Sequence, residues 1–208
     1  AGPCLRRTPE AGAASVVGDL RVAVRAAMRY ARAGFKTGIG RKDNAMEKTV
    51  AIMLGDGFEP VEAIGPADVL RRGGAVVDLV SVMGRAEVSS AHEVTVVADK
   101  LLDEVDLSSY DLLVVPGGSV GVDHLAVCAP LADELRRRMA ADELVGAICA
   151  GPTILANLGL LEGREAVCYP GCEDAFPAGA YQAGSDVAVD GNLITATGPG
   201  IALVFGVA

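Results

Sequence analysis

Cys149 stands alone between two apolar runs in the stretch LVGAICAGPTILANL, residues 144–158. The run before it is typical of a buried strand, and the run after it is typical of a helix that begins at Pro152. A sharp strand-to-helix turn with small residues, here Ala150 and Gly151, lifts a nucleophile above a sheet. We therefore interpret Cys149 as a nucleophile whose pKa is lowered by the helix N-terminus. The alternative is a buried apolar side chain, the commonest role of a free cysteine.

Two carboxylates and two glycines follow other predicted strands. A predicted helix opens with Glu59 and Glu62. Either both carboxylates only cap the helix N-terminus, or one of them is a protonated acid that donates a hydrogen bond to the Cys149 thiolate. Gly117 and Gly118 follow the strand-like run DLLVV, and their amides either bind a developing oxyanion or only form a turn. Because the carboxyl ends of parallel strands meet at one edge of a sheet, we expect these groups and Cys149 to share one crevice.

The remaining histidines and cysteines carry weaker signals. His92 and His124 are each expected to be surface or capping residues rather than catalytic bases. The five cysteines are an odd number and form no C-x-x-C pair, so we expect free thiols in a reducing compartment and no metal site. The cysteines expected to be structural or exposed are Cys4, Cys128, Cys168 and Cys172.

The composition limits the classes of function. The chain has 208 residues, 51% of them hydrophobic, and a formal charge of −9. Residues 1–48 hold ten Lys or Arg and four Asp or Glu, a charge of +6 that leaves −15 on the remainder. An acidic body argues against nucleic acid as the main partner. No run of about 18 apolar residues occurs, so a membrane span is not expected.

Strand and helix patterns alternate from residue 48 onward. Helices of ten or more residues between strands indicate right-handed βαβ units, and hence an α/β three-layer sandwich with a mainly parallel central sheet. Strands are expected over 48–54, 75–82, 111–118, 145–148 and 166–170, and two more strands joined by an Asp-Gly turn are expected within 187–196. A hairpin is expected in 86–105, and helices are expected in 55–74, in 130–143 and from residue 152.

Residues 1–46 have a different composition, rich in Ala, Arg and Gly. Arginines recur at helical spacing between residues 21 and 32, which predicts a short amphipathic helix. We interpret the segment as an extension outside the core domain, which spans 47–208. Such an extension would be either artificial or the result of a wrongly assigned start of the protein. The alternatives are a transit peptide and a genuine surface helix. The expected location is the cytoplasm, or an organelle if residues 1–45 are a transit peptide.

Four stretches together resemble the ThiJ/PfpI superfamily, and in particular its branch of parkinsonism-associated protein deglycases. They are GDGFEPVEAIGPADVLRRGG, DLLVVPGG, GAICAGPTILANLGLLEGREAVCYPGCED and DGNLITATGPG, in this order from about residue 47 to the end. The resemblance implies a flavodoxin-like fold and a homodimer. It implies Cys149 as the nucleophile, Glu62 as the acid bonded to it, and the amides of Gly118 and Ala150 as the oxyanion pocket. The other expected pocket residues are Glu59, Gly117, Tyr169 and Pro199.

The implied activity is cofactor-free conversion of methylglyoxal or glyoxal, or removal of early glycation adducts from protein side chains. The alternative is a redox-sensing stress-response protein or chaperone that works through oxidation of Cys149. Ala150 stands where the protease-like branches have histidine, which disfavours peptidase chemistry. Tyr169 stands where deglycases can have histidine, TAT precedes GPG where an arginine can occur, and the closing helix is expected to be short.

Overall fold

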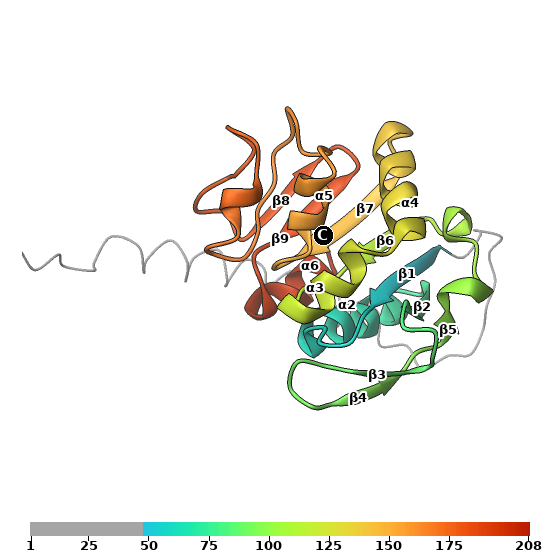
Figure 1. Ribbon diagram of the computed structural model, residues 1–208. Coiled ribbons are helices and arrows are strands. Elements are labelled where there is room, and N and C mark those ends of the chain that lie inside the picture. The colour runs from blue at the N-terminus through green and yellow to red at the C-terminus, as the bar shows by residue number, and fades with distance from the viewer. Residues whose placement is uncertain (1–47) are drawn as a thin grey trace, which may run out of the picture. The chain divides into compact units, whose positions relative to one another are not determined.

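The computed structural model describes residues 48–208 (Figure 1), and the predicted leader, residues 1–46, with its helix lies outside the described residues. A seven-stranded sheet has the strand order β5-β2-β1-β6-β7-β9-β8. All neighbouring strands are parallel except β8, which runs antiparallel to β9. The strands are β1 (Thr49–Leu54), β2 (Val76–Ser81), β5 (Lys100–Leu101), β6 (Leu112–Val115), β7 (Leu144–Ile148), β8 (Val187–Asp190) and β9 (Leu193–Ala196), and a separate hairpin pairs β3 (Glu87–Ser89) with β4 (Thr95–Val97).

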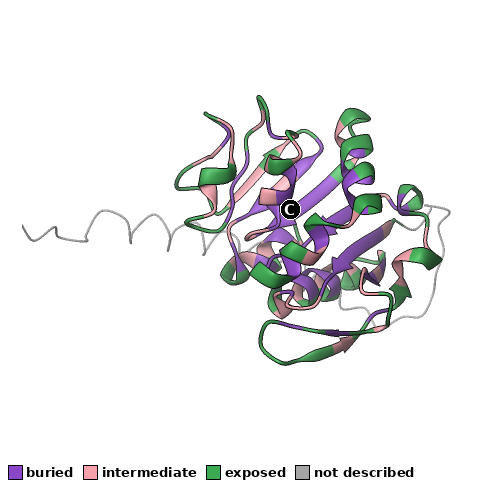
Figure 2. Cartoon of the chain, viewed as in Figure 1, coloured by how far each residue is buried: buried purple, intermediate pink, exposed green. Residues whose placement is uncertain are grey.

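Helices cover both faces of this sheet, so the predicted α/β three-layer sandwich is confirmed. Alternate residues of a strand point to opposite faces: Ala51 and Met53 pack in one core cluster, and Val50 and Ile52 pack in the other. Figure 2 shows the buried central strands between these layers. The first cluster includes side chains of α3 (Ser119–Ala126), α4 (Ala129–Ala140) and α5 (Pro152–Asn157), and the second includes side chains of α2 (Pro60–Arg72) and α6 (Ala202–Phe205).

The predicted strands were largely confirmed, with three differences. The hairpin predicted in 86–105 extends only from Glu87 to Val97, because Lys100 and Leu101 form β5 at the edge of the main sheet, parallel to β2. The segment 166–170 is not a strand, because only the isolated bridge between Ala166 and Tyr181 forms there. Helix α3 was not expected, because it begins directly after two glycines. Within residues 48–208, no helix is both long and apolar enough to cross a membrane. The described residues also form four short 3-10 turns: η1 (Leu102–Glu104), η2 (Leu107–Ser109), η3 (Glu173–Ala175) and η4 (Pro199–Ile201).

Helix α2 begins where the sequence predicted and carries a site residue in its first turn. Glu59 is its N-cap, with Oε1 3.4 Å from the amide of Val61, and Pro60 occupies the first helical position, where no N–H is needed. Arg71 and Arg72 lie in the last turn, where cations are favoured by the helix dipole. The capped start holds Glu62 at the carboxyl end of β1.

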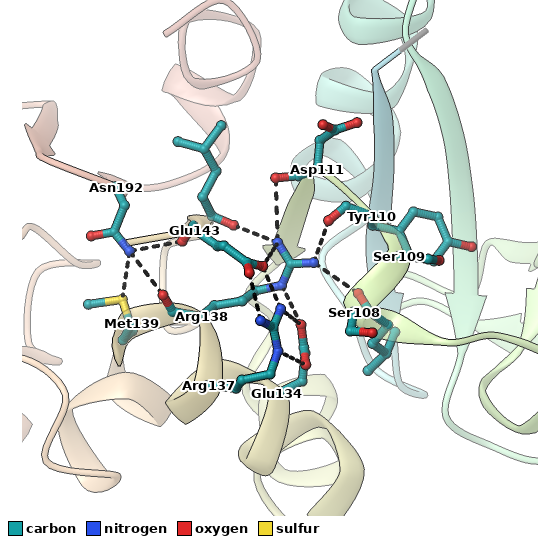
Figure 3. Close-up of polar contacts among 12 residues, drawn as sticks. Ser108, Ser109, Tyr110, Asp111, Glu134, Arg137, Arg138, Met139, Glu143 and Asn192 are labelled. Atoms are coloured by element: carbon teal, nitrogen blue, oxygen red, sulfur yellow. Dashed lines mark hydrogen bonds and ion pairs between the residues drawn. The ribbon is translucent and has the colours of Figure 1, made fainter. Parts of the chain in front are cut away.

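A buried arginine joins the opposite, amino ends of the strands (Figure 3). Arg138 of α4 is 0% exposed, and its guanidinium donates to the carbonyls of Leu107, at 2.9 Å, and of Leu144, at 3.2 Å. It also donates to the Tyr110 carbonyl and forms a 2.8 Å ion pair with Glu134. One side chain therefore donates hydrogen bonds to the buried carbonyls that precede β6 and to the carbonyl that opens β7.

Candidate active site

Cys149 lies at the predicted turn between β7 and α5. Its φ of 62° is in the left-handed region, which is uncommon for a residue with a side chain and marks local strain. Two hydrogen bonds fix the turn: the Cys149 amide donates to the Ala196 carbonyl at 2.9 Å, and the Tyr169 amide donates to the Cys149 carbonyl at 2.8 Å. The thiol is half-buried at the carboxyl edge of the sheet.

Glu62 reaches the same point from α2, and its side chain is 0% exposed. Its Oε2 accepts a 2.9 Å hydrogen bond from the amide of Gly117, which follows β6. The close approach requires a glycine, since a Cβ at position 117 would lie 2.6 Å from Glu62 Oε2 and 2.9 Å from Cys149 Sγ. The strands β1, β6 and β7 are neighbours in the sheet. The prediction that Glu62, Gly117 and Cys149 lie close together is therefore confirmed.

Two backbone amides favour the charged form of the Cys149 thiol. The N–H groups of Gly118 and Ala150 each lower the pKa of the thiol, because they favour the thiolate. Gly118 has a φ of 89°, and a Cβ there would lie 2.3 Å from the Gly57 carbonyl oxygen, so no larger residue fits. The two predicted amides therefore converge where negative charge would develop.

The surroundings raise the pKa of both side chains in the pair. The pKa of Glu62 is raised to about 7, mainly by burial and to a smaller extent by the charge of Glu59, against hydrogen bonds from Cys149 and Gly117 that lower it. Burial, followed by the charge of Glu62 and the hydrogen bond to it, raises the pKa of Cys149 to about 12. The prediction of a lowered pKa for this thiol is therefore wrong. The following helix has only six residues, and its effect is outweighed by burial beside a carboxylate.

The pair can nevertheless supply a thiolate by moving one proton internally. The second largest cause of the raised Cys149 pKa is the charge of Glu62, and that charge is absent when the carboxyl is protonated. A proton transferred from Sγ to Glu62 leaves the charge of the pair unchanged and turns the carboxyl into a hydrogen-bond donor. With a Glu62 pKa of about 7, the carboxyl is able to hold that proton at neutral pH.

Tyr169 and Gly198 form a wall beside the pair. A Cβ at Gly198 would lie 3.1 Å from Cδ2 of Tyr169 and 3.9 Å from Oε1 of Glu62. This Oε1 is buried and has no hydrogen-bond partner among the described residues. Tyr169 is 49% exposed, so it lies at the mouth. Pro199 is exposed as well, and Gly198, which the sequence analysis did not name, is the residue of this segment that faces Glu62.

His92 is a second residue that the sequence analysis did not place at the site. Its Nε2 lies 3.1 Å from Oε2 of Glu59, the N-cap of α2. The sequence predicted only a surface or capping histidine. The contact arises because the β3–β4 hairpin docks onto the β1 loop, and no local sequence pattern indicates such a tertiary contact. The remaining described cysteines are free thiols outside the pair, and no group of three or more His, Cys, Asp or Glu within residues 48–208 could hold a metal ion.

Comparisons with known proteins find relatives of this chain in sequence and in fold. The profile described as the DJ-1/PfpI family matches residues 48–208. Protein DJ-1 homolog B of Arabidopsis thaliana is 37% identical over 184 residues, which cover 88% of this chain and 42% of the relative. The chain thus spans about two fifths of the length of the plant relatives it matches.

Other relatives are matched over most of their length. A deglycase of Pyrococcus abyssi is 36% identical over 157 residues, 73% of this chain and 90% of the relative. A glutathione-independent glyoxalase of Caenorhabditis elegans is 34% identical over 163 residues, 77% and 86% of the two chains. The crystal structure of Drosophila melanogaster DJ-1beta has a TM-score of 0.74 and 34% identity, and covers 77% of this chain and 87% of its own. Oxidized Toxoplasma gondii DJ-1 has a TM-score of 0.73 and 36% identity, covering 76% and 86%.

Proposed function

Because this chain belongs to the DJ-1/PfpI family, we propose that it is a cysteine-dependent, cofactor-free glyoxalase or protein deglycase. Its substrates are 2-oxoaldehydes such as methylglyoxal and glyoxal, or their early adducts with protein side chains. A glyoxalase and a deglycase among the relatives support this proposal. The observation that carries it is the Cys149 thiol held between two amides and a buried acid whose pKa is about 7.

The first step is addition of sulfur to the aldehyde. Glu62 takes the thiol proton, and the thiolate of Cys149 attacks the aldehyde carbon. A carbon–sulfur bond forms while the π electrons of the carbonyl move onto oxygen. The amides of Gly118 and Ala150 stabilise this oxyanion, and a proton from Glu62 then yields the hemithioacetal.

The second step is an internal oxidation and reduction that needs no cofactor. Ionised Glu62 removes the proton from the former aldehyde carbon and returns a proton to the neighbouring carbon. The hydroxyl proton of the hemithioacetal moves to the former ketone oxygen, so the former aldehyde carbon is oxidised to a thioester and the former ketone is reduced to an alcohol. Water then cleaves the thioester, which releases lactate from methylglyoxal and restores the thiol.

The test is replacement of the nucleophile. Cys149→Ser should lower the rate of lactate formation from methylglyoxal by at least about a hundredfold, since a hydroxyl is a far weaker nucleophile than a thiolate. Cys128→Ser, at a half-buried cysteine of the α4 N-terminus, should leave the rate unchanged. The proposal is wrong if the parent protein forms no lactate, or if Cys149→Ser forms it at the parent rate.

One observation favours a second candidate function. The amides of Gly118 and Ala150 favour negative charge on the sulfur, so they would also stabilise the charged oxygen atoms of an oxidised cysteine. The chain would then be a redox-sensing protein in which peroxide oxidises Cys149. Mass spectrometry after mild peroxide should find two added oxygens on Cys149 before other cysteines change, and unselective oxidation would exclude this function.

We also propose a homodimer that buries the outer face of α2 and α6. This face carries three large apolar residues that are partly exposed: Val61 (48%), Ile64 (38%) and Leu203 (57%). A Cβ at Gly65 would lie 3.4 Å from Leu203, so the two helices present one apolar surface. Light scattering should give twice the chain mass for the parent and the single mass for Ile64→Lys.

The proposed compartment is the cytoplasm. Cys128, Cys149, Cys168 and Cys172 are free thiols, as expected in a reducing environment. An organelle remains the alternative if residues 1–45 are a transit peptide. Cell fractionation with intact-mass measurement of the natural protein would distinguish the two compartments.

A further inference from the structure

Arg85 and Asp56 form an ion pair between two segments that lie beside the candidate site. Arg85 precedes β3, and Asp56 belongs to the β1 loop, residues 55–59, which leads into α2. The guanidinium contacts both carboxylate oxygens: Nη1 donates to Oδ1 at 3.3 Å, and Nη2 pairs with Oδ2. Nη1 also donates to the Glu87 carbonyl at 2.6 Å. A two-point contact of this kind fixes the orientation of both side chains.

The carboxylate of Asp56 also joins the β1 loop to strand β3. Its Oδ1 accepts a 3.0 Å hydrogen bond from the amide of Ser89, and the amide of Gly57 donates to the Ser89 carbonyl at 2.7 Å. The Asp56 side chain is 26% exposed, and the hydrogen bond from Arg85 is the main cause that lowers its pKa. This one ionised carboxylate therefore connects the arginine, the loop and the hairpin.

The β1 loop is in close contact with the residues that follow β6. The amide of Glu59 donates to the Gly117 carbonyl at 3.0 Å. A Cβ at Gly118 would lie only 2.3 Å from the carbonyl oxygen of Gly57. Because no free space separates the two segments, a shift of the loop would displace Gly117 as well.

Gly117 connects the loop to the reactive pair. Its carbonyl accepts from the loop, while its amide donates to Oε2 of Glu62 at 2.9 Å. A Cβ at this position would lie 2.6 Å from Cβ of Cys149 and 2.9 Å from Sγ. The placement of this single residue therefore sets how closely Glu62 and Cys149 approach each other.

We infer that Arg85 is a positioning residue that holds the β1 loop through Asp56 and thereby fixes the spacing of Glu62 and Cys149. The inference rests on the proposed role of Glu62 as the proton partner of Cys149. Proton transfer requires hydrogen-bond distance, so a small displacement lowers its rate. Within residues 48–208, the side chain of Arg85 bonds to Asp56 and the Glu87 carbonyl and to neither member of the pair.

Alkylation of Cys149 tests the inference without relying on glyoxalase activity. The full chain is treated with iodoacetamide at pH 7, and modification of Cys149 is followed by peptide mass spectrometry. Arg85→Met should slow the reaction about fivefold, because displaced Glu62 accepts the thiol proton less readily. Arg85→Lys should recover part of the rate, since it keeps one donor for Asp56.

The matched control is Arg72→Met. Arg72 is an exposed arginine that pairs with Asp68 in the last turn of α2, so its loss should leave the alkylation rate unchanged. The urea midpoints of Arg72→Met and Arg85→Met should be similar, since both arginines belong to solvent-exposed ion pairs. A slower thiol at an unchanged midpoint separates positioning from loss of stability.

Steady-state kinetics give a second readout. For lactate formation from methylglyoxal, Arg85→Met should lower kcat about fivefold and change KM by less than about twofold, because Arg85 acts on proton transfer and not on substrate binding. If the parent protein forms no lactate, the proposed function fails, and the alkylation rates alone decide this inference.

A double-mutant cycle tests the route through Asp56. Asp56→Ala should slow alkylation at least as much as Arg85→Met, because it also removes the acceptor of the Ser89 amide. The double variant should be no slower than Asp56→Ala alone. The inference is overturned if Arg85→Met is alkylated at the parent rate, if Arg85→Lys is no faster than Arg85→Met, or if the two losses multiply in the double variant. It is also overturned if Arg72→Met slows the reaction as much as Arg85→Met does.

Discussion

Two buried charged side chains lie at opposite ends of the same strands and differ in how well they are satisfied. Arg138, at the amino ends, donates hydrogen bonds to backbone carbonyls from both terminal nitrogens (Figure 3). Its Nε forms no hydrogen bond within residues 48–208, but it lies 2.8 Å from Oε1 of Glu134 in an ion pair. Glu62, at the carboxyl ends, has one oxygen bonded to Gly117 and one without a partner among residues 48–208. Both side chains are 0% exposed.

The difference separates a structural charge from a reactive one. The acceptors around Arg138 offset the cost of burying its charge. Loss of either the arginine or its partners would leave buried polar groups uncompensated and would destabilise the fold. Glu62 is under-satisfied, and burial therefore raises its pKa to about 7, where a proton can be gained or lost during a reaction. We expect substitutions at the first site to change stability and substitutions at the second to change chemistry.

The largest expected effect is at Arg138. Arg138→Met should lower the free energy of unfolding by about 3–5 kcal/mol, because Glu134 and several carbonyls would lose their buried partner. Arg136→Met is the matched control, since Arg136 is a half-exposed arginine of the same helix, and it should change stability by less than about 0.5 kcal/mol. Urea unfolding measures both. Equal effects of the two substitutions would remove the distinction between the buried cluster and an ordinary surface pair.

The next effect is on chemistry. Glu62→Gln should lower the rate of lactate formation from methylglyoxal by about 10²–10³-fold, because the amide cannot take the thiol proton. Its stability at neutral pH should be unchanged or higher, since a buried ionisable group becomes neutral. Asp68→Asn, on the exposed side of the same helix, should leave the rate unchanged. A fully active Glu62→Gln would show that this buried acid is structural, like Arg138.

A third effect appears in the pH dependence of stability. The folded-state pKa of Glu62, about 7, lies above the ordinary value of 4.5, so the folded protein binds this proton more tightly than the unfolded chain does. The resulting stabilisation is complete below about pH 4.5 and is lost as pH rises through about 7. Relative to Glu62→Gln, the parent protein should lose roughly 3 kcal/mol over this interval. Urea unfolding of both proteins at a series of pH values measures this loss. A stability difference between them that does not change with pH would show that the pKa of Glu62 is ordinary.

The smallest effect concerns the spacing of the pair. Gly117→Ala should slow alkylation of Cys149 at neutral pH by about tenfold, because the added methyl group pushes Glu62 and the sulfur apart. Gly200→Ala is the control, since a Cβ there meets no atom within 4 Å. If both variants are alkylated at the parent rate, the close approach at Gly117 is not needed to position the pair.

Much of the fold was predictable because its signals are local. The apolar runs of β1, β6 and β7 and the Asp-Gly turn between β8 and β9 were recognised from residue types alone. The segment 166–170 has the composition of a strand but remains outside the sheet, where it places Tyr169 over the site. Local propensity does not reveal which strand-like segments find a partner.

The candidate site was predictable in its members but not in its electrostatics. Cys149, the Glu59 and Glu62 pair, and the Gly117 and Gly118 pair were named because each follows a predicted strand or opens a helix. The choice of Glu62 and of the Ala150 amide came from the family resemblance. The contact of His92 with Glu59 spans 33 residues and depends on how a hairpin docks, so no local pattern indicates it. The same applies to Gly198, whose position against Glu62 follows from the packing of β9 beside β7.

The sequence by itself determined which groups reach the carboxyl edge of the sheet, since periodicity and turn residues set the order of strands and helices. Only the tertiary structure decided their protonation, and it reversed the expected direction for Cys149. The physical reason is that a pKa depends on desolvation and on charges brought close by folding, such as Glu62 beside a sulfur 87 positions along the chain.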